Sequence, residues 1–398
     1  MGRSRRVLIA GGGIGGLAAA LALLRDGHEV TVCEQAKELR EVGAGVQLAA
    51  NATRVLIELG LGKALEKVAC VPAGKEVRLY DTGKTWKLFD LGEESMQRYG
   101  APYWLLHRAD LHDVLVDALR ERWPHALLTS AHVTAFNQSD THVELLLADG
   151  RKLEADALIG ADGIHSVVRR SLFGDMNVNF LGRAAWRGVV PAARLPEHLR
   201  RLVATNWVGP GVNAVVYPLR RGELINFVGA IGNVKGWTSE SWTDAGTTEE
   251  VLADFQGWHA DIQQIVRQIE VPLKWAYRGR EPLQQWSVGN VTLLGDAAHP
   301  TLPTLAQGAN MAIEDGLVLA RCLRLDEPIS STLRRYEAAR VPRTSKIVRS
   351  STENARRFQD DRLGGADASA YVDKEWHPDA IAERYNWLFE YDARTTSI

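Results

Sequence analysis

The sequence has few cysteines, almost no net charge and only one long uncharged stretch. Its 398 residues contain three widely spaced cysteines, Cys33, Cys70 and Cys322. This odd number predicts neither a disulfide framework nor a zinc site, and it favours a reducing cytoplasm. The formal net charge of −2 leaves no basic excess to neutralise nucleic-acid phosphates. We therefore expect no metal, no nucleic-acid partner and a cytoplasmic location.

The single uncharged stretch, residues 7–24, follows three arginines and superficially resembles a secretion signal. Five glycines within residues 11–16 would weaken an apolar helix that inserts into a membrane. The alanines that follow are succeeded by more leucine, and not by the polar residues expected where a mature secreted protein begins. Export is therefore the disfavoured interpretation. Because no second such stretch occurs, we expect no membrane span.

The same segment predicts a nucleotide site when it is extended to residues 6–34. It has the pattern of a buried strand, a glycine turn, a helix and a second strand. Gly11, Gly13 and Gly16 fit the dinucleotide fingerprint, whose glycines allow a tight turn, a close pyrophosphate and close packing of helix on strand. A glycine motif alone is weak evidence, but here all the flanking elements are present in order.

Two further parts of this segment support dinucleotide binding. The expected helix, residues 15–25, begins with free backbone N–H groups that form an anion site. Glu34 ends the second strand, where its carboxylate is placed to accept hydrogen bonds from ribose hydroxyls. Ile14, Gly15 and Gln35 join the candidate cofactor-binding residues as neighbours of these groups.

Two hydrophobic patterns alternate along the chain and predict an α/β fold of two interleaved domains. One domain is Rossmann-like, the other is built on an antiparallel sheet, and an aromatic-rich tail follows that we expect to be helical. The expected ranges are 1–75, 98–178 and 276–360 for the first domain, 76–97 and 179–275 for the second, and 361–398 for the tail.

Local signals predict where several helices begin and end. Asn51 is expected to cap the helix that follows it, and Asp110 to cap a helix over residues 111–122. One helix is expected between residues 248 and 269, and a long one from near Met311. Five arginines are expected to form a solvated face on a later charged helix: Arg334, Arg335, Arg340, Arg343 and Arg349.

Three motifs in this order resemble a known family. They are the glycine turn of residues 11–16, then Gly160-Ala161-Asp162-Gly163 with Arg169, then Gly295-Asp296-Ala297-Ala298-His299-Pro300 with Gln307-Gly308-Ala309-Asn310. Over about residues 5–350 the chain resembles the single-component FAD-dependent aromatic hydroxylases, the family of p-hydroxybenzoate hydroxylase. It is most similar to the salicylate, 3-hydroxybenzoate and 6-hydroxynicotinate hydroxylases. The resemblance makes the first domain the FAD-binding domain and the second the substrate domain.

The resemblance also implies which residues hold FAD. Asp296 would accept from ribityl hydroxyls, and the helix N-terminus at residues 308–310 would stabilise the reduced flavin ring. Arg108 resembles the family arginine near the FAD phosphates, and Asp162-Gly163 resembles the motif linked to FAD and pyridine nucleotide. The expected set is Gly11, Gly13, Ile14, Gly15, Gly16, Glu34, Gln35, Arg108, Asp162, Gly163, Asp296, Gly308, Ala309 and Asn310.

The family's reaction implies FAD as the cofactor, NADH or NADPH as a transient electron donor and O2 as co-substrate. Only one dinucleotide fingerprint is present, so the donor would bind without a Rossmann domain of its own. The substrate would be a small aromatic acid of the salicylate or 3-hydroxybenzoate type, attacked through a flavin C4a-hydroperoxide. Neither a metal nor a catalytic nucleophile is needed, and the enzyme would be a monomer or a homodimer.

Five residues are candidates for the substrate pocket. Tyr217 and Asn213 share one face of a predicted strand by its period of two, and the Tyr217 phenol could bind the substrate carboxylate or hydroxyl. Relatives carry histidine near the positions of Asn213 and Thr304, so a catalytic base is missing here if that alignment holds. Pro303 is expected to position the ring with its carbonyl, and Gln47 to contact the flavin. A buried core tyrosine remains the plain alternative for Tyr217, and a structural turn the favoured role for His299.

Three functions stay open. The leading one is hydroxylation of a benzoate-type acid. A hydroxylase of an N-heteroaromatic acid such as 6-hydroxynicotinate, or a non-hydroxylating flavin oxidoreductase, is the alternative. A flavoprotein kept for binding or redox sensing is the non-enzymatic possibility.

Overall fold

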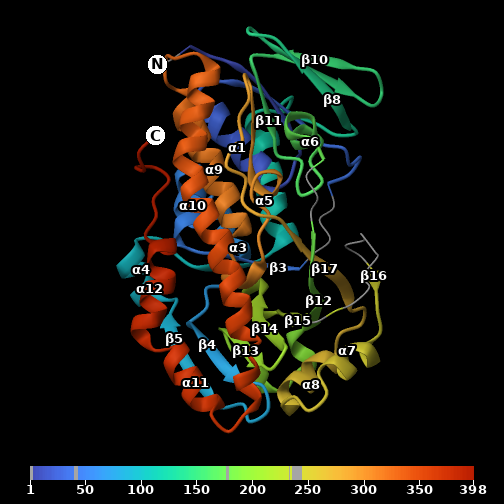
Figure 1. Ribbon diagram of the computed structural model, residues 1–398, viewed down its shortest axis with the longest axis vertical. Coiled ribbons are helices and arrows are strands. Elements are labelled where there is room, and N and C mark those ends of the chain that lie inside the picture. Colours follow the sequence, from blue (N-terminus) through green and yellow to red (C-terminus); the bar gives the residue numbers. More distant parts are fainter. Residues whose placement is uncertain (1–2, 40–43, 176–178, 233, 235–243) are drawn as a thin grey trace.

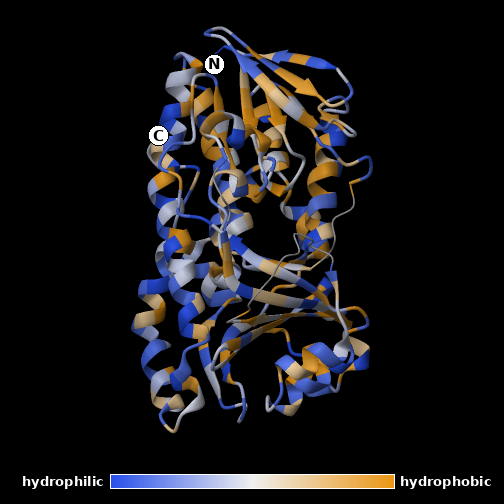
Figure 2. Ribbon diagram, turned by 45° about the vertical axis from the view of Figure 1, so that its right-hand side comes forward, coloured by the Kyte–Doolittle hydropathy of each residue, from blue (hydrophilic) through white to orange (hydrophobic). Residues whose placement is uncertain are grey.

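The computed structural model describes residues 3–39, 44–175, 179–232, 234 and 244–398. A parallel sheet fills its upper half in Figure 1, and its hydrophobic strands stand out in Figure 2. Residues 7–10 lie fully inside this sheet because they are an uninterrupted apolar run. The strand order is β18 (Val291–Leu293), β11 (Ala157–Gly160), β1 (Arg6–Ala10), β2 (Glu29–Cys33) and β7 (Leu127–Leu128).

Helices pack against the parallel sheet. The helix α1 (Ile14–Arg25), which follows the glycine turn, packs against α9 (Gly308–Leu323) and α5 (Arg108–Arg122). The long helix α10 (Ile329–Phe358) packs on α9 and extends from this half into the other, as Figure 1 shows. Smaller helices in this part of the chain are α2 (Ala50–Glu58), α3 (Gly62–Val68), α4 (Glu93–Tyr99) and α6 (Val167–Phe173).

An eight-stranded sheet forms the lower half in Figure 1. Its pairs are antiparallel except for β4 with β13, which run parallel. Its strand order is β16 (Asp244–Ala245), β17 (Leu273–Gly279), β12 (Asn179–Pro191), β15 (Leu224–Ile231), β14 (Val212–Leu219), β13 (Val203–Gly209), β4 (Gly74–Leu79) and β5 (Thr85–Asp90). One face of this sheet is turned toward the parallel half, and α7 (Thr248–Asp254) and α8 (Ala260–Arg267) pack on the other.

Two small sheets complete the fold. One is an antiparallel meander of β8 (Val133–Gln138), β9 (Val143–Leu147) and β10 (Lys152–Ala155). The other pairs β3 (Gly45–Leu48) with β6 (Trp104–His107), where the chain passes between the two halves. The C-terminal helices α11 (Ala368–Glu375) and α12 (Pro378–Phe389) pack beside β4 and β5 through a shared hydrophobic cluster. The predicted α/β fold class, with an antiparallel-rich sheet and C-terminal helices, is confirmed.

Three local predictions about helices are wrong. Asn51 lies inside α2 and not at its cap, because Ala49 ends the preceding extended segment. The helix expected from residue 111 begins at Arg108, so Asp110 sits in the first turn and pairs with Arg220. The single helix expected over 248–269 is two helices, because Gly257 between them has φ +79°.

Within the described ranges, no helix combines the length and apolar character needed to cross a membrane.

Candidate functional site

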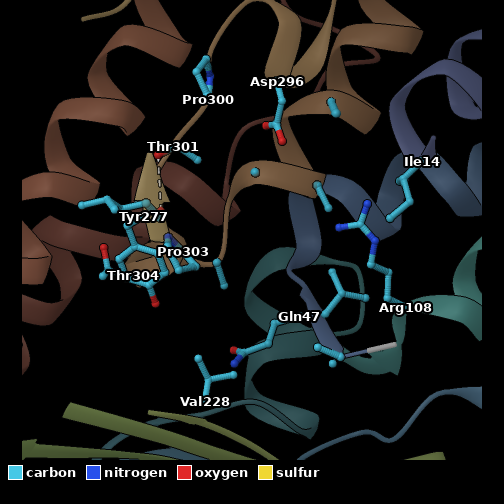
Figure 3. A pocket seen from close by; sticks show the side chains of 18 of the residues that line it. Ile14, Gln47, Arg108, Val228, Tyr277, Asp296, Pro300, Thr301, Pro303 and Thr304 are labelled. Atoms are coloured by element: carbon cyan, nitrogen blue, oxygen red, sulfur yellow. Dashed lines mark hydrogen bonds between the residues drawn. The ribbon is translucent and has the colours of Figure 1, made fainter. Parts of the chain in front are cut away.

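A cavity of about 370 Å³ lies between the two halves. It is bounded by the glycine turn and α9 on one side and by the eight-stranded sheet on the other. Figure 3 shows Arg108 and Ile14 on one flank, Pro303 and Thr304 on the opposite flank, and Asp296 across from Gln47. Of the predicted site residues, those that line it are Gly13, Ile14, Gly15, Gln47, Arg108, Gly163, Asn213, Tyr217, Asp296, Pro303, Thr304, Gly308 and Ala309.

The glycine turn presents bare backbone to this cavity. A Cβ atom on Gly11 would lie 2.4 Å from the Ala161 carbonyl oxygen, and one on Gly16 would lie 2.1 Å from the Gly11 oxygen. A Cβ on Gly13 would meet nothing within 4 Å, so this glycine faces open space at the start of α1. The turn is fixed from behind by His112, whose Nε2 lies 2.8 Å from the Gly12 carbonyl oxygen. The sequence pattern around His112 does not predict this contact.

Several predicted residues lie near the cavity without lining it. Glu34 accepts hydrogen bonds from the backbone N–H groups of Gly12 (2.9 Å) and Ala36 (2.8 Å). Asp162 accepts from the backbone of Val167 at 2.7 Å and so holds the start of α6. Gly11, Gly16 and Gln35 also do not line the cavity, and the side chain of Gln35 is exposed.

Asn310 acts inside the fold. Its Nδ2 donates to the carbonyls of Gln47 (2.9 Å) and Ala306 (2.6 Å), and its Oδ1 accepts from the N–H of Ala49 at 2.8 Å. The start of α9 is thereby tied to the end of β3. This link fixes the backbone of Gln47, whose side chain lines the cavity, relative to the start of α9.

Gln47 and Tyr217 both line the cavity on the side of the eight-stranded sheet. The Gln47 side-chain oxygen accepts from the hydroxyl of Tyr103 at 2.7 Å. Burial raises the pKa of Tyr217 well above its usual value, although Arg187 opposes the shift. The Tyr217 phenol therefore stays protonated and can donate a hydrogen bond.

The other three pocket candidates differ in how free their polar groups are. Asn213 lies on the same face of β14 as Tyr217, and its Oδ1 accepts from Gln359 Nε2 at 2.9 Å. The Thr304 hydroxyl donates to the carbonyl of Ser351 in α10 at 2.5 Å, so its proton is already committed. Pro303 begins a 3-10 turn at the cavity edge.

Sequence reasoning missed a cationic and aromatic wall on β12 and β17. The guanidinium carbon of Arg187 lies 3.2 Å from the ring centroid of Trp275, so the two groups stack. Burial lowers the pKa of Arg187 to about 10, which leaves it charged at neutral pH. Tyr277 lines the same wall, and burial raises its pKa to about 12. The only sequence signal is the alternating pattern along two strands, which does not distinguish cavity-lining residues from core packing.

It also missed a pair of buried polar residues on the neighbouring strands β4 and β13. Lys75 is 5% exposed and Asn206 is 1% exposed, and both line the cavity. Burial lowers the pKa of Lys75 to about 8. No motif marks either residue, because neither belongs to a recognisable spacing of polar residues in its short strand.

The predicted solvated arginine face is half wrong. Arg334, Arg335 and Arg349 are exposed, but Arg340 is fully buried and Arg343 nearly so. Arg340 pairs with Glu314 and Asp315, both also buried, at 2.7 Å each, and Arg343 pairs with Glu314 at 2.7 Å. The face of α10 that carries Arg340 and Arg343 packs on α9, and periodicity alone did not reveal that α9 offers two acids there.

The same ion cluster supports the turn that carries Asp296. Asp315 Oδ2 lies 2.6 Å from His299 Nε2 and accepts from the Gly295 N–H at 3.1 Å. Burial acts to raise the pKa of Asp315, but His299 and Arg340 hold it below its usual range. His299 is 1% exposed and does not line the cavity, which fits a structural role in this turn.

Comparisons with known proteins agree with one another. Residues 4–351 match a family model described as an FAD binding domain. The chain is 41% identical over 354 residues to 3-hydroxybenzoate 6-hydroxylase of Polaromonas naphthalenivorans, covering 88% of this chain and 87% of that protein. It is 39% identical to 3-amino-4-hydroxybenzoate 2-monooxygenase PtnB3 of Streptomyces platensis, covering 98% and 96%.

Solved structures show the same likeness. A salicylate hydroxylase substrate complex superposes with a TM-score of 0.82 at 28% identity, covering 98% of this chain and 96% of that one. Klebsiella pneumoniae HpxO complexed with FAD and uric acid superposes with a TM-score of 0.83 at 25% identity, covering 98% and 97%.

Proposed function

Since this chain belongs to the FAD-binding-domain family and aromatic hydroxylases are among its relatives, we propose that it is an FAD-dependent monooxygenase that hydroxylates a small aromatic acid. The family membership confirms the resemblance inferred from the three motifs. The observation that carries the proposal is the single cavity shared by the glycine turn and the eight-stranded sheet. A cofactor end and a substrate end are thus continuous.

The residues at the cofactor end fit FAD. Gly13 leaves open space before the N-terminus of α1, where a pyrophosphate can approach backbone N–H groups. Arg108 and Asp296 both line the cavity, suited to phosphate and to ribityl hydroxyls respectively. Gly308 and Ala309 at the start of α9 face the cavity with the positive end of the helix dipole. Bound FAD would supply the redox chemistry, with NADH or NADPH as electron donor and O2 as oxidant.

The chain's own residues would bind and orient the substrate. The Tyr217 phenol, kept protonated, would donate a hydrogen bond to a substrate oxygen, while Pro303 borders the ring. Among the described residues that line the cavity, Asp296 is the one acidic side chain and none is histidine. We therefore assign no side chain as the base, and propose that the positive charge of Arg187 favours the phenolate form of the substrate.

We propose a benzoate-type acid as the substrate, because the curated relatives named above act on hydroxylated benzoates and one solved neighbour is a salicylate hydroxylase.

We also propose a reducing cytoplasmic location for the protein. The three cysteines are buried free thiols, which is in keeping with this location.

The test is reaction stoichiometry. Purified FAD-loaded protein is given NADH or NADPH, O2 and a panel of hydroxybenzoates and 6-hydroxynicotinate, and hydroxylated product and hydrogen peroxide are counted separately. We expect at least one benzoate to give product in proportion to donor consumed. Peroxide as the sole product with every acid would contradict the proposal and favour the non-hydroxylating flavin oxidoreductase.

A further inference from the structure

Lys75 is a buried cation for which the described part of the chain provides no counter-ion. It lies on β4, is 5% exposed and lines the cavity. Within the described ranges no carboxylate lies within 4.0 Å of its ammonium group, and its one close partner is the Tyr385 ring, whose centroid is 6.0 Å away. A buried charge is costly unless it is paired, so such a residue is seldom kept for packing.

Asn206 is a second unsatisfied group beside it. It lies on β13, next to β4, and neither its amide nitrogen nor its amide oxygen has a partner in the described structure. The register pairs Lys75 with Ala204, and Asn206 follows two residues later on the same face. A cation and an amide thus open onto one part of the cavity, and Ala204, opposite Lys75 in the register, carries only a methyl group.

We propose that Lys75 and Asn206 form an anion subsite that holds the carboxylate of the aromatic substrate. The inference rests on the proposed function. The ammonium group supplies charge and donors, and the Asn206 amide supplies one further donor to the same carboxylate. Nearby walls are apolar, with Val215 one strand away on β14 and Phe358 at the end of α10, and suit the face of a ring.

The position of Arg187 makes Lys75 the better carboxylate anchor. Arg187 lies on β12, separated from β4 by β15, β14 and β13, so Arg187 and Lys75 stand on strands about 19 Å apart at the usual strand spacing. Its guanidinium is already stacked on Trp275, and Arg108 of the cofactor end is among the charges that act on it. Among the described residues, no charged group is found to act on Lys75 in this way, and its lowered pKa of about 8 still leaves it mainly cationic near pH 7. The carboxylate therefore points away from the cofactor end.

The test compares an acid with its neutral isostere. Dissociation constants for 3-hydroxybenzoate and 3-hydroxybenzamide are measured on FAD-loaded protein from the change in flavin absorbance. For Lys75→Met we expect at least tenfold weaker binding of the acid and less than twofold change for the amide. Lys75→Arg should keep the preference for the acid. Lys84→Met, on the exposed turn of the same hairpin, is the matched control and should bind both ligands as the unmodified protein does.

A second variant keeps the inference testable if Lys75→Met does not fold. Asn206→Asp places a negative charge in the subsite, and we expect it to weaken acid binding by at least tenfold while sparing the amide. Unchanged discrimination in both variants would overturn the subsite and leave the proposed function standing. Failure of the unmodified protein to bind any hydroxybenzoate would instead overturn the proposed function, and the subsite with it.

Discussion

Buried polar side chains at the α9–α10 contact and on the cavity wall differ in whether they have ionic or hydrogen-bond partners. At the helix contact, Arg340 is paired with two buried carboxylates, and one of these also holds His299. On the wall, Lys75 has no carboxylate within 4.0 Å, and both amide atoms of Asn206 lack partners in the described structure. The two regions lie in one chain and are similarly shielded from solvent.

The difference distinguishes polar groups that stabilise the fold from polar groups that can bind a ligand. In a closed set, the buried charged groups are paired with one another, and these contacts offset the cost of burying them. Such a set stabilises the fold and has no group free to bind a ligand. In an open set, the buried polar groups have no partners, so their desolvation cost is not offset in the free protein. A ligand with complementary groups can offset it on binding. The contrast predicts opposite signs for removing a charge in the two regions.

Arg340→Met should give the largest effect. It leaves Glu314 and Asp315 buried with one cation fewer, and removal of one member of a buried ion pair costs about 3–5 kcal/mol of unfolding free energy. Chemical denaturation of the FAD-loaded protein measures it. Arg334→Met on the exposed side of the same helix is the control, expected within about 0.5 kcal/mol of the unmodified protein. Equal losses in the two variants would remove the distinction between the faces of α10.

Lys75→Met should shift stability the other way. The folded pKa of Lys75 is about 8 and its ordinary value is 10.5, so the unfolded chain binds more protons between these values. The charged lysine destabilises the fold fully below about pH 8, and this penalty disappears as the pH rises toward 10.5. Without substrate at pH 7, the variant should be more stable by at most roughly 3 kcal/mol.

The measurement for Lys75→Met is a pair of denaturation series at pH 7 and pH 9.5, taken on both proteins so that other titrating groups cancel. The advantage of the variant should shrink at the higher pH. A variant less stable than the unmodified protein at pH 7 would mean that the ammonium has a stabilising partner, and Lys75 would then belong with the closed set.

Gly13→Ala should separate binding from stability at the cofactor end. Its Cβ would enter open space, and the backbone there has φ −74°, which alanine adopts freely. We expect unchanged unfolding of the apoprotein and FAD affinity at least about tenfold lower, or ~1.4 kcal/mol. Gly16→Ala is the contrasting variant, because its Cβ would collide with the Gly11 carbonyl and should reduce both. Normal FAD affinity in Gly13→Ala would mean that the cofactor does not approach this backbone.

The same contrast explains what the sequence could predict. The glycine turn, the Gly295-Asp296 turn and the start of α9 are local, and their glycines are required by backbone geometry that spacing reveals. The cavity wall is assembled from β4, β13, β14, β12 and β17, which are brought together only by the sheet. Lys75 and Arg187 were therefore invisible as site residues, and Arg340 was misjudged because its acids come from another helix. Tyr217 and Asn213 could be predicted to share one face of a strand, where alternation is sufficient, and both line the cavity.

Thr304→Val should give the smallest effect and tests whether lining the cavity is enough to place a residue in the open set. Its hydroxyl donates to the Ser351 carbonyl, so it resembles the helix contact more than the wall. Losing this bond should cost about 1 kcal/mol of unfolding free energy, and the NADH-coupled turnover of the best substrate should change less than twofold. Tyr217→Phe is the paired variant, since the Tyr217 phenol can turn toward a ligand; the lost hydrogen bond should lower turnover about tenfold with FAD still bound. If Thr304→Val lowers turnover as much as Tyr217→Phe does, the threonine hydroxyl must leave Ser351 during the reaction. Whether a polar group has a hydrogen-bond partner in the free protein would then no longer tell functional from structural groups.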